Sequence, residues 1–335
     1  MKLAHRRPAR RPARRPARRL ARRLATALTA ASALVLAMTS PGAAGAAGAA
    51  PVKVEPLAVT SLPPMGAKAA ELTAKARGGT ARTASPQRAR AARAFHELQL
   101  NLCNSGKAAC YADGQAVFEG GDLIYVLAPD LVTLNEICSV DLPDYLQPSL
   151  AEAWPDDWTY SVFQPALNKA TGQPITCTNG GTYGNAVLGR VPADLWQGAE
   201  GWAGQYTTQD SGNEVRTFAC AYAIGDHLSC ATHLSAASEA IALAQCRALM
   251  FDAVPYIRSE EGISGKTVVG GDFNLEYDTS DPENVQKCVP AGNVRKGDGD
   301  VQHVIFSNDF AFTGRSTFGM THTDHDALLI KLSKP

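Results

Sequence analysis

The chain has no Cys-x-x-Cys pair and no long unbroken apolar run, residues 95–335 contain no internal repeat, and the first 50 residues contain no acidic side chain. Without Cys-x-x-Cys spacing, a cysteine-based zinc site is disfavoured. The apolar run from Leu24 to Met38 is too short and too interrupted for a membrane span. The chain therefore has few features of a zinc-binding or membrane-spanning protein.

The N-terminus combines three features that are typical of an export signal. Eleven basic residues precede the apolar run, and a tract of small residues, Gly42 to Ala50, follows it. The repeated Arg-Pro-Ala-Arg could instead form a nucleic-acid-binding arm, but its position directly before an apolar run argues against that. No twin-arginine consensus is convincing, so the export route stays open. We predict that residues 1–50 are an export signal and that the protein is secreted.

Charge is unevenly distributed. The chain has 32 basic and 32 acidic residues, and because eleven basic ones lie in the first 50 residues, the remainder carries 21 basic against 32 acidic. Residues 51–94 are rich in Ala, Pro, Thr and basic side chains and lack aromatics, which predicts a disordered linker or pro-segment. From Phe95 onward 13 basic residues face 30 acidic ones, a net charge of −17. Such a surface gives no long-range attraction to a polyanion, although some of the carboxylates could collect cations.

All eight cysteines lie after residue 94. An even number of cysteines in an exported protein favours disulfides over free buried thiols. Cys103 with Cys110 would close a small loop, and Cys220 with Cys230 would staple a hairpin.

Residues 95–335 contain no second linker, so we predict one domain there. Extended runs are expected at Glu97–Leu102, Asp122–Leu127, Leu131–Leu134, Val301–Ser307 and Ala327–Leu332, a hairpin at Thr217–Ala223 and Leu228–Leu234, and a helix from Ser238 to Ile257. Strands with occasional helices in one domain of this size predict an α/β sandwich of two packed sheets with helices outside.

One stretch, Thr267 to Asn274, joins a short apolar strand to two glycines and two polar residues. In an extended segment residues i and i+2 point the same way, so Asp272 and Asn274 would face one pocket while Phe273 packs behind them. Taken alone, the stretch is better interpreted as a strand that ends in an Asp/Asn turn, and only matching partners elsewhere in the chain favour a site.

Matching polar residues follow other predicted strands, in a fixed order along the chain. They are Asn101, Glu136, the strand Gly184 to Arg190 with Asn185 near its start, His233 in Thr-His-Leu, and the pair Asp324-His325. This ordered set resembles the endonuclease/exonuclease/phosphatase superfamily, the DNase I-like proteins, from about Phe95 to the C-terminus.

The resemblance implies a four-layer α/β sandwich of two mixed sheets with outer helices, and hydrolysis of phosphate esters with Mg²⁺ or Mn²⁺. It implies the metal ligands Asn101, Glu136 and Asp324, the catalytic residues His233, Asp272, Asn274 and His325, and phosphate contacts from Asn185 and Arg190. Hard oxygen ligands suit Mg²⁺, histidines titrate near neutral pH, and an arginine can clamp a phosphate with two hydrogen bonds. Which histidine is the acid and which the base stays open.

The sequence departs from the family's pattern at one place. The strand before the last motif usually carries an aspartate that orients the final histidine, and His303 stands where that aspartate is expected. Asp298 or Asp300 could substitute for it. No confident counterpart supports His233; Gln164 and Glu214 are guesses. The four tryptophans could form a substrate wall but are more often core residues.

Three functions then compete. The first is an extracellular nuclease acting on DNA or RNA, and the second is a sphingomyelinase-like or small-molecule phosphodiesterase or phosphatase. The third is a binding module that lost turnover, suggested by His303. We expect a phosphate-ester substrate, with nucleic acid favoured narrowly, no membrane span after signal removal, and a monomer.

Overall fold

The structure, a computed structural model, describes residues 52–66 and 93–334. Its strands are β1 (Lys53–Leu57), β2 (Thr60–Leu62), β3 (Arg93–Asn101), β4 (Leu131–Cys138), β5 (Asp157–Pro165), β6 (Leu167–Asn168), β7 (Tyr183–Pro192), β8 (Ala199–Gln205), β9 (Glu214–Val215), β10 (Thr217–Ala223), β11 (His227–His233), β12 (Thr267–Asp272), β13 (Asn293–Gly297), β14 (Gln302–Ser307), β15 (Ala311–Phe318) and β16 (Ala327–Lys334). Its helical segments are α2 (Gln115–Leu127), η1 (Leu142–Leu146), α3 (Gln147–Ala153), α4 (Glu239–Arg247), η2 (Ala248–Ala253), α5 (Val254–Glu260) and η3 (Val285–Cys288).

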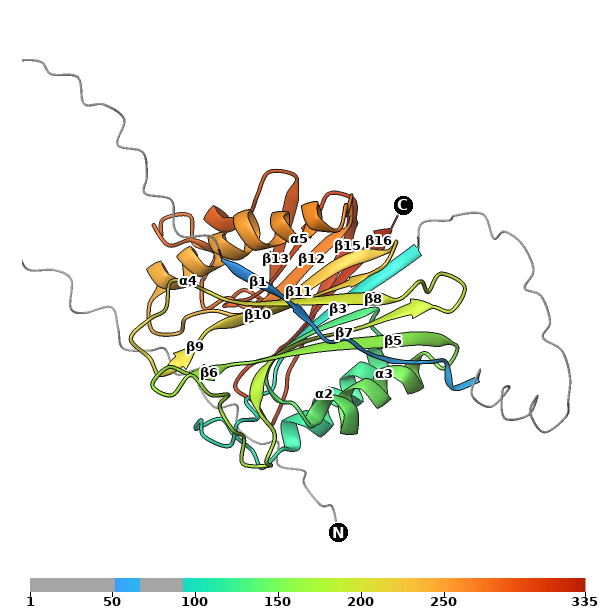
Figure 1. The fold of residues 1–335 in the computed structure, drawn as a ribbon, viewed down its shortest axis with the longest axis horizontal. Coiled ribbons are helices and arrows are strands. Elements are labelled where there is room, and N and C mark those ends of the chain that lie inside the picture. Colours follow the sequence, from blue (N-terminus) through green and yellow to red (C-terminus); the bar gives the residue numbers. More distant parts are fainter. Residues whose placement is uncertain (1–51, 67–92, 335) are drawn as a thin grey trace, which may run out of the picture. The chain divides into compact units, whose positions relative to one another are not determined.

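The strands form two seven-stranded mixed sheets and a small two-stranded one. The first sheet has the order β1-β8-β10-β11-β12-β14-β13, and the second has the order β15-β16-β3-β4-β7-β5-β2. Figure 1 shows the sheets stacked between helices, with α4 and α5 on one outer face and α2 and α3 on the other. The predicted four-layer α/β sandwich is confirmed.

Three buried clusters hold the layers together. Side chains such as Val162, Val268 and Val304 fill the space between the sheets. Leu249 and its neighbours bury α4 to α5 against the first sheet, and Ile124 and its neighbours bury α2 and α3 against the second. Apolar side chains that alternate along each strand therefore serve two cores, one on each face of its sheet.

The N-terminal boundary of the domain differs from the prediction. Residues 51–94 were expected to be a linker, but β1 pairs with β8 at the edge of the first sheet and β2 pairs with β5 at the edge of the second. These two short strands cover one edge of each sheet, where unpaired backbone groups would otherwise be exposed. The predicted export signal, residues 1–50, lies outside the described residues.

The expected strand at Asp122–Leu127 is wrong, because this run is the end of helix α2. Its buried residues include Val117, Gly120, Gly121 and Ile124, which recur at helical spacing. The apolar β-favouring run at the end of α2 resembled a strand, and the two glycines that let the helix approach the second sheet and α3 weakened the helical signal.

The helix predicted at 238–257 is present as α4, η2 and α5 in succession, and the Ser238 side chain accepts a hydrogen bond from the Ile241 amide at its start. By length and composition, the stretch Glu239–Glu260 is the one described helix that could cross a membrane. Its apolar side instead packs on the first sheet, as a core helix does.

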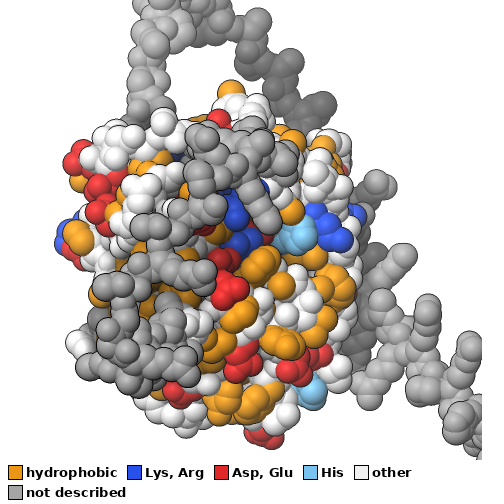
Figure 2. Space-filling model, turned by 90° about the vertical axis from the view of Figure 1, so that its right-hand side faces the viewer, with side chains coloured by type: hydrophobic (Ala, Val, Ile, Leu, Met, Phe, Trp, Pro, Cys, Tyr) orange, Lys and Arg blue, Asp and Glu red, His pale blue; other side chains and the backbone are white. Residues whose placement is uncertain are grey.

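The two ends of the sandwich differ in content. Strand β3 begins at Arg93, at the right of Figure 1, and runs to Asn101 at the opposite end. Figure 2 views the end at which β3 begins, where Lys and Arg side chains lie beside Asp and Glu among hydrophobic ones. Most of the predicted site residues lie at the other end of the strands.

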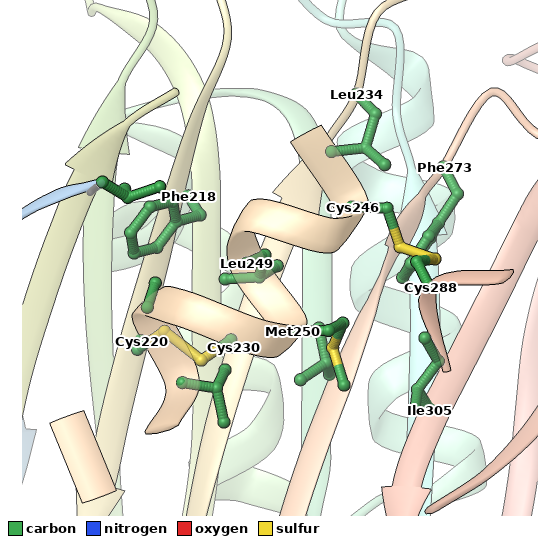
Figure 3. Close-up of a cluster of buried hydrophobic side chains, with 14 of the residues drawn as sticks. Phe218, Cys220, Cys230, Leu234, Cys246, Leu249, Met250, Phe273, Cys288 and Ile305 are labelled. Atoms are coloured by element: carbon green, nitrogen blue, oxygen red, sulfur yellow. A yellow bond between two sulfur atoms is a disulfide. The ribbon is translucent and has the colours of Figure 1, made fainter. Parts of the chain in front are cut away.

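All eight cysteines are paired. The predicted Cys103–Cys110 and Cys220–Cys230 disulfides are present, and Cys138–Cys177 and Cys246–Cys288 complete the set. Figure 3 shows Cys220–Cys230 and Cys246–Cys288 beside Leu249 and Met250 in the core under α4. The other two lie close to the ends of β3 and β4, where they fasten the loops that leave these strands.

Candidate active site

Strand pairing brings four predicted site residues to one end of the sandwich. In the second sheet β3 and β4 are parallel, so Asn101 and Glu136 come from neighbouring strand ends. In the first sheet β11 and β12 are parallel, with His233 directly opposite Asp272. Because the sheets pack face to face, these ends meet, and Asn101 hydrogen-bonds across the interface to Asp272.

Glu136 is turned toward this site by an irregularity in its strand. The β4–β7 register shifts between Leu134 and Ile137, and Glu136 itself has a φ of 56°. Such a bulge re-aims a side chain at the cost of local backbone strain. The Glu136 carboxylate accepts a hydrogen bond from Asn101 Nδ2 at 3.1 Å, and burial raises its pKa. The bulge therefore delivers a carboxylate that is partly removed from water.

Asp272 is held on three sides. Its Oδ2 accepts from Asn101 Nδ2 at 3.1 Å, its Oδ1 accepts from the Asn274 amide at 3.0 Å, and its Oδ2 lies 3.3 Å from His325 Nε2. Burial raises the pKa of Asp272, and the His325 charge opposes that shift. The carboxylate has a fixed orientation, as a catalytic base requires.

Asn274 does not share the pocket in the way that simple alternation predicts. Strand β12 ends at Asp272, and Asn274 has a φ of 48°, so the chain is no longer extended there. The Asn274 side-chain amide donates to the Leu234 carbonyl at 3.0 Å. Phe273 is buried in the outer core, as expected. The structure thus corrects the role of Asn274: it fastens the turn after Asp272 to the residue after His233.

The two histidines have different environments. His233 Nε2 lies 3.9 Å from both Glu136 Oε1 and Asp272 Oδ2, and its Nδ1 has no hydrogen-bond partner among the described residues. Burial, followed by the nearby charge of Arg216, lowers the pKa of His233 well below its usual value. His325 is partly exposed and contacts Asp272 directly. His233 is therefore neutral near pH 7.

Asp324 lies beside this group on the loop before β16. Its Oδ1 is 3.8 Å from His325 Nε2, and 61% of its side chain is exposed. Its charge contributes to the raised pKa of Glu136. Asp324 is thus the exposed carboxylate of the site.

Asn135 is a central residue of the site that the sequence argument missed. Its Oδ1 accepts from Gln99 Nε2 and from the Asp272 amide, both at 2.7 Å. Its Nδ2 donates to Asn185 Oδ1 at 3.0 Å and to the Thr232 carbonyl at 2.9 Å. One amide thereby joins both sheets directly behind Asp272. A polar residue facing inward within the apolar strand β4 was the available signal.

Asn185 has a different role from the predicted one. Its Oδ1 is occupied by Asn135, and its Nδ2 donates to the Thr217 carbonyl at 3.3 Å. The side chain is buried. Since both ends of the amide are bonded within the scaffold, Asn185 supports the site and is not positioned as a phosphate ligand.

Arg190 is not part of this cluster, which corrects its predicted contact with phosphate. Its guanidinium pairs with Asp130 and, at 2.6 Å, with Asp157, and it lies 3.7 Å above the Trp154 ring. Asp130 immediately precedes β4, whereas Glu136 lies near the other end of that strand. Arg190 is therefore a buried structural cation of the opposite end.

The buried cation beside the site is Arg216, which the sequence argument did not single out. It directly precedes β10 and donates from Nη1 to Glu214 Oε1 at 3.0 Å. Burial raises the pKa values of Asp272 and Glu136, and the Arg216 charge opposes that rise; the same charge also opposes protonation of His233. Glu214, one of the two guessed supports of His233, pairs instead with Arg216, and burial raises its pKa to about 7.

The strand β14 explains the departure at His303. His303 pairs with Gly271, accepts from Arg295 Nη1 at 3.0 Å and donates from Nε2 to the Leu275 carbonyl at 2.8 Å. It is a buried neutral residue behind the turn that follows Asp272. Gln302 is the residue opposite Asp272, and its buried amide has no partner among the described residues. The residue of β14 opposite Asp272 is therefore Gln302, which is one position before His303, where the family's aspartate was expected.

The tryptophans do not form a wall around these residues. Trp158 and Trp196 stack on each other with ring centroids 5.2 Å apart, next to Tyr160. Trp154 lies under Arg190, and Trp202 is buried in the core of the first sheet. Trp202 is thus a core residue, as expected, whereas Trp154, Trp158 and Trp196 are half-buried.

The described residues contain two groups with three potential ligand atoms close together. They are Glu239 with Asp281 and Glu283, near the start of α4, and Cys103 with Cys110 and Asp324. The cysteines are paired with each other, so the second group offers only Asp324. The first group is an acidic cluster that could hold a cation.

Among the predicted ligands, Glu136 and Asp324 have the donor chemistry of a divalent cation site. The nearby Asp272 charge disfavours ionisation of Glu136, and a cation would relieve that repulsion. Asn101 fits less well, because its Oδ1 accepts from the Cys103 amide and its nitrogen faces the carboxylates. In this arrangement Asn101 orients the Glu136 carboxylate, and its own side-chain oxygen is not available to bind a metal together with Glu136.

No family model and no curated protein matches this chain. Solved structures do match it. The chain is similar to endonuclease/exonuclease/phosphatase structures. One from Bacteroides vulgatus is 13% identical with a TM-score of 0.46 and covers 72% of this chain and 100% of its own. One from Beutenbergia cavernae is 16% identical, with a TM-score of 0.46 and coverage of 72% and 71%. The human Nocturnin catalytic domain, which has a bound sulfate, is 16% identical, with a TM-score of 0.47 and coverage of 71% and 94%.

Proposed function

We propose that this protein is a divalent-metal-dependent phosphodiester hydrolase, and that its substrate is a nucleic acid. The observation that supports this most is the junction of the two sheets, where Asp272, Glu136, His233 and His325 converge beside the buried cation Arg216. Carboxylates, histidines and a guanidinium at one point are what hydrolysis of an anionic ester needs: a base, charge neutralisation and hydrogen-bond donors.

In this proposal Asp272 takes the proton of the attacking water. Its carboxylate is held in one orientation by Asn101, the Asn274 amide and His325. Water attacks phosphorus, the bond from phosphorus to the leaving oxygen breaks, and that oxygen takes a proton from solvent water, while Asp272 returns its proton to solvent before the next turnover. His325 is partly exposed, which suits a contact with the substrate phosphate.

His233 receives a hydrogen-bonding role in the same reaction. Because its pKa is lowered well below its usual value, His233 is a neutral imidazole near pH 7 and has no second ring proton to give to the leaving oxygen. A neutral imidazole can still donate one hydrogen bond to a phosphate oxygen. We therefore assign His233 a contact with the phosphate in preference to the acid role.

Glu136 and Asp324 are the residues proposed to hold Mg²⁺ or Mn²⁺. A bound cation supplies Lewis acidity and neutralises charge that develops on the phosphate oxygens. Asn101 keeps the Glu136 carboxylate oriented through its 3.1 Å hydrogen bond.

A smaller phosphodiester is the second candidate. The net charge of −17 from Phe95 onward disfavours non-specific binding of a long polyanion. The location outside the cell is also part of the proposal, supported by the basic and apolar N-terminal sequence and by four disulfides.

Removal of divalent metal is expected to abolish hydrolysis. The purified domain would be incubated with plasmid DNA, RNA, sphingomyelin and bis-p-nitrophenyl phosphate, with Mg²⁺ or Mn²⁺ and with EDTA. Nuclease activity predicts cleavage of DNA or RNA that stops with EDTA and returns with added metal. Cleavage of only the small ester or the lipid would favour the second candidate. No turnover of any substrate with metal would refute the hydrolase proposal.

Arg216→Ala is expected to raise KM for the cleaved substrate by about 10- to 100-fold, because the site loses the buried positive charge that would offset the charge of a bound phosphate. Arg216→Lys keeps the charge without the planar fork and should give an intermediate KM. Arg93→Ala removes an exposed cation at the opposite end of β3 and serves as the control. Equal KM values for all three variants would contradict a role of the Arg216 charge in substrate binding. Steady-state kinetics on folded protein makes the measurement.

A further inference from the structure

The loop between β15 and β16, residues 319–326, carries both Asp324 and His325 but has no regular secondary structure. Its backbone amides therefore need partners other than a neighbouring strand. His325 must nevertheless lie 3.3 Å from Asp272 for the pair to form. The residues that hold this loop decide where the His325 ring lies.

One carboxylate from a distant part of the chain holds the first half of the loop. Glu119, in helix α2, accepts from the Thr321 amide at 2.8 Å through Oε1 and 3.0 Å through Oε2. Its Oε2 also lies 3.1 Å from the His322 amide and 3.1 Å from His322 Nδ1. A single side chain, 202 residues away from Thr321 in sequence, thus binds two consecutive backbone amides and a ring nitrogen.

The second half of the loop is fastened to the site itself. The Thr323 hydroxyl donates to the Asn101 carbonyl at 2.9 Å. With Glu119 on one side and Asn101 on the other, Asp324 and His325 follow directly after two fixed points. The loop therefore has little freedom to move the His325 ring away from Asp272.

Glu119 is well suited to this task. Its helix is packed on the second sheet through Val117, Gly120 and Ile124, so its backbone is rigid. Hydrogen bonds to an ionised carboxylate are about twice as strong as those between neutral groups. Burial alone would raise the pKa of Glu119, but the bonds from Thr321 and His322 outweigh it and lower the pKa. The carboxylate is thus charged when it holds the loop.

We propose that Glu119 is a positioning residue for catalysis: by binding the Thr321 and His322 amides, it sets the place of His325 against Asp272. This inference rests on the proposed hydrolase function for its kinetic consequence. Its structural part, the anchoring of the loop, is independent of any substrate.

The test compares Glu119→Gln with Asp122→Asn in the full domain. Glutamine has nearly the same shape but places an NH₂ group against backbone N–H donors and loses the charge. Asp122 is exposed on the same helix and has no hydrogen bond or ion pair with the loop among the described residues, so its variant controls for loss of one negative charge. Glu119→Asp keeps the charge on a shorter side chain and should recover part of the function.

Two measurements are needed. Without substrate, amide hydrogen exchange across residues 319–326 should rise about 10-fold or more in Glu119→Gln, since hydrogen-bonded amides exchange only on opening. With the substrate found to be cleaved, kcat should fall about 10- to 100-fold with little change in KM, because a displaced catalytic group costs turnover more than binding. Asp122→Asn should match the unmodified protein in both.

Each result decides the proposal. Unchanged exchange in Glu119→Gln overturns the anchor, and faster exchange with unchanged kcat overturns the positioning role. Faster exchange with lower kcat and partial recovery in Glu119→Asp supports it. If the unmodified protein cleaves none of the substrates, the hydrolase proposal fails, and the loop anchor is then decided by exchange alone.

Discussion

Asp272→Asn is expected to lower kcat for phosphodiester cleavage by about 10³-fold, because the site loses the group proposed to accept the proton of water. The substitution keeps the shape of the side chain, but its one oxygen can keep only one of the two bonds, either that from Asn101 to Oδ2 or that from the Asn274 amide to Oδ1. Asp252→Asn, an exposed position on the outer helix, is the matched control. Steady-state kinetics with a check of folding by circular dichroism makes the measurement.

The pairing of Asp272 with His325 adds a sharper requirement. His325 Nε2 and Asp272 Oδ2 are 3.3 Å apart, so we expect the two side chains to act as one unit. The losses of kcat caused by the two substitutions should therefore not add. His325→Ala in the Asp272→Asn background is expected to cost little beyond the single variants. A folded Asp272→Asn protein with near-normal turnover would remove Asp272 from the reaction.

Glu97→Gln is expected to change the pH dependence of stability. Glu97 lies between the sheets, where its Oε1 accepts from Thr133 Oγ1 at 2.5 Å and its Oε2 has no partner among the described residues. Burial raises its pKa from 4.5 to about 8. Between these values the unfolded chain releases the proton while the folded chain keeps it, so the free energy of unfolding falls as pH rises.

The stability of Glu97→Gln relative to the native protein should therefore increase with pH. Below about pH 4.5 the side chain at this position is neutral in both proteins, and the difference in unfolding free energy between the variant and the native protein is constant. From there to about pH 8 the unfolding free energy of the variant rises relative to that of the native protein, by up to about 5 kcal/mol in total. Above about pH 8 the difference is again constant. Urea unfolding across this range measures it, with Glu152→Gln on the exposed face of α3 as control. A difference that does not vary with pH would show that Glu97 is not protonated in the folded chain.

Glu97 is also the far end of a polar chain that leads to the site. Thr133 bonds to Glu97 and Gln99, and Gln99 bonds to Asn135, which holds the Asp272 amide. A buried network of this kind is stabilising only when its members are satisfied. The Glu97 Oε2 atom, which has no partner among the described residues, is its weak point, because a charge on this carboxyl would be buried without a partner at that oxygen.

The local parts of the fold could be predicted from the sequence. The hairpin at Thr217–Ala223, the late strands and the helix from Ser238 have periodicity or turn residues that depend only on neighbours in the chain. The run at 122–127 was misjudged for the same reason, because its β-favouring side chains hid a helix whose buried face is defined by contacts with the second sheet. The strands β1 and β2 gave no signal, since edge pairing depends on partners about 100 to 150 residues away.

The candidate site divides in the same way. By itself the sequence indicated which polar residues lie next to strands, and it singled out Glu136, His233, Asp272 and His325 because the boundary of a strand is a local feature. Tertiary structure alone decided which of them meet. The tertiary structure placed Arg190 at the end of the sandwich opposite the candidate site and Arg216 beside that site. It also put Gln302 opposite Asp272, and it brought Asn135 to the Asp272 amide and Glu119 to the loop that carries His325. Strand register and sheet packing bring these distant residues together, and both are set by the whole chain.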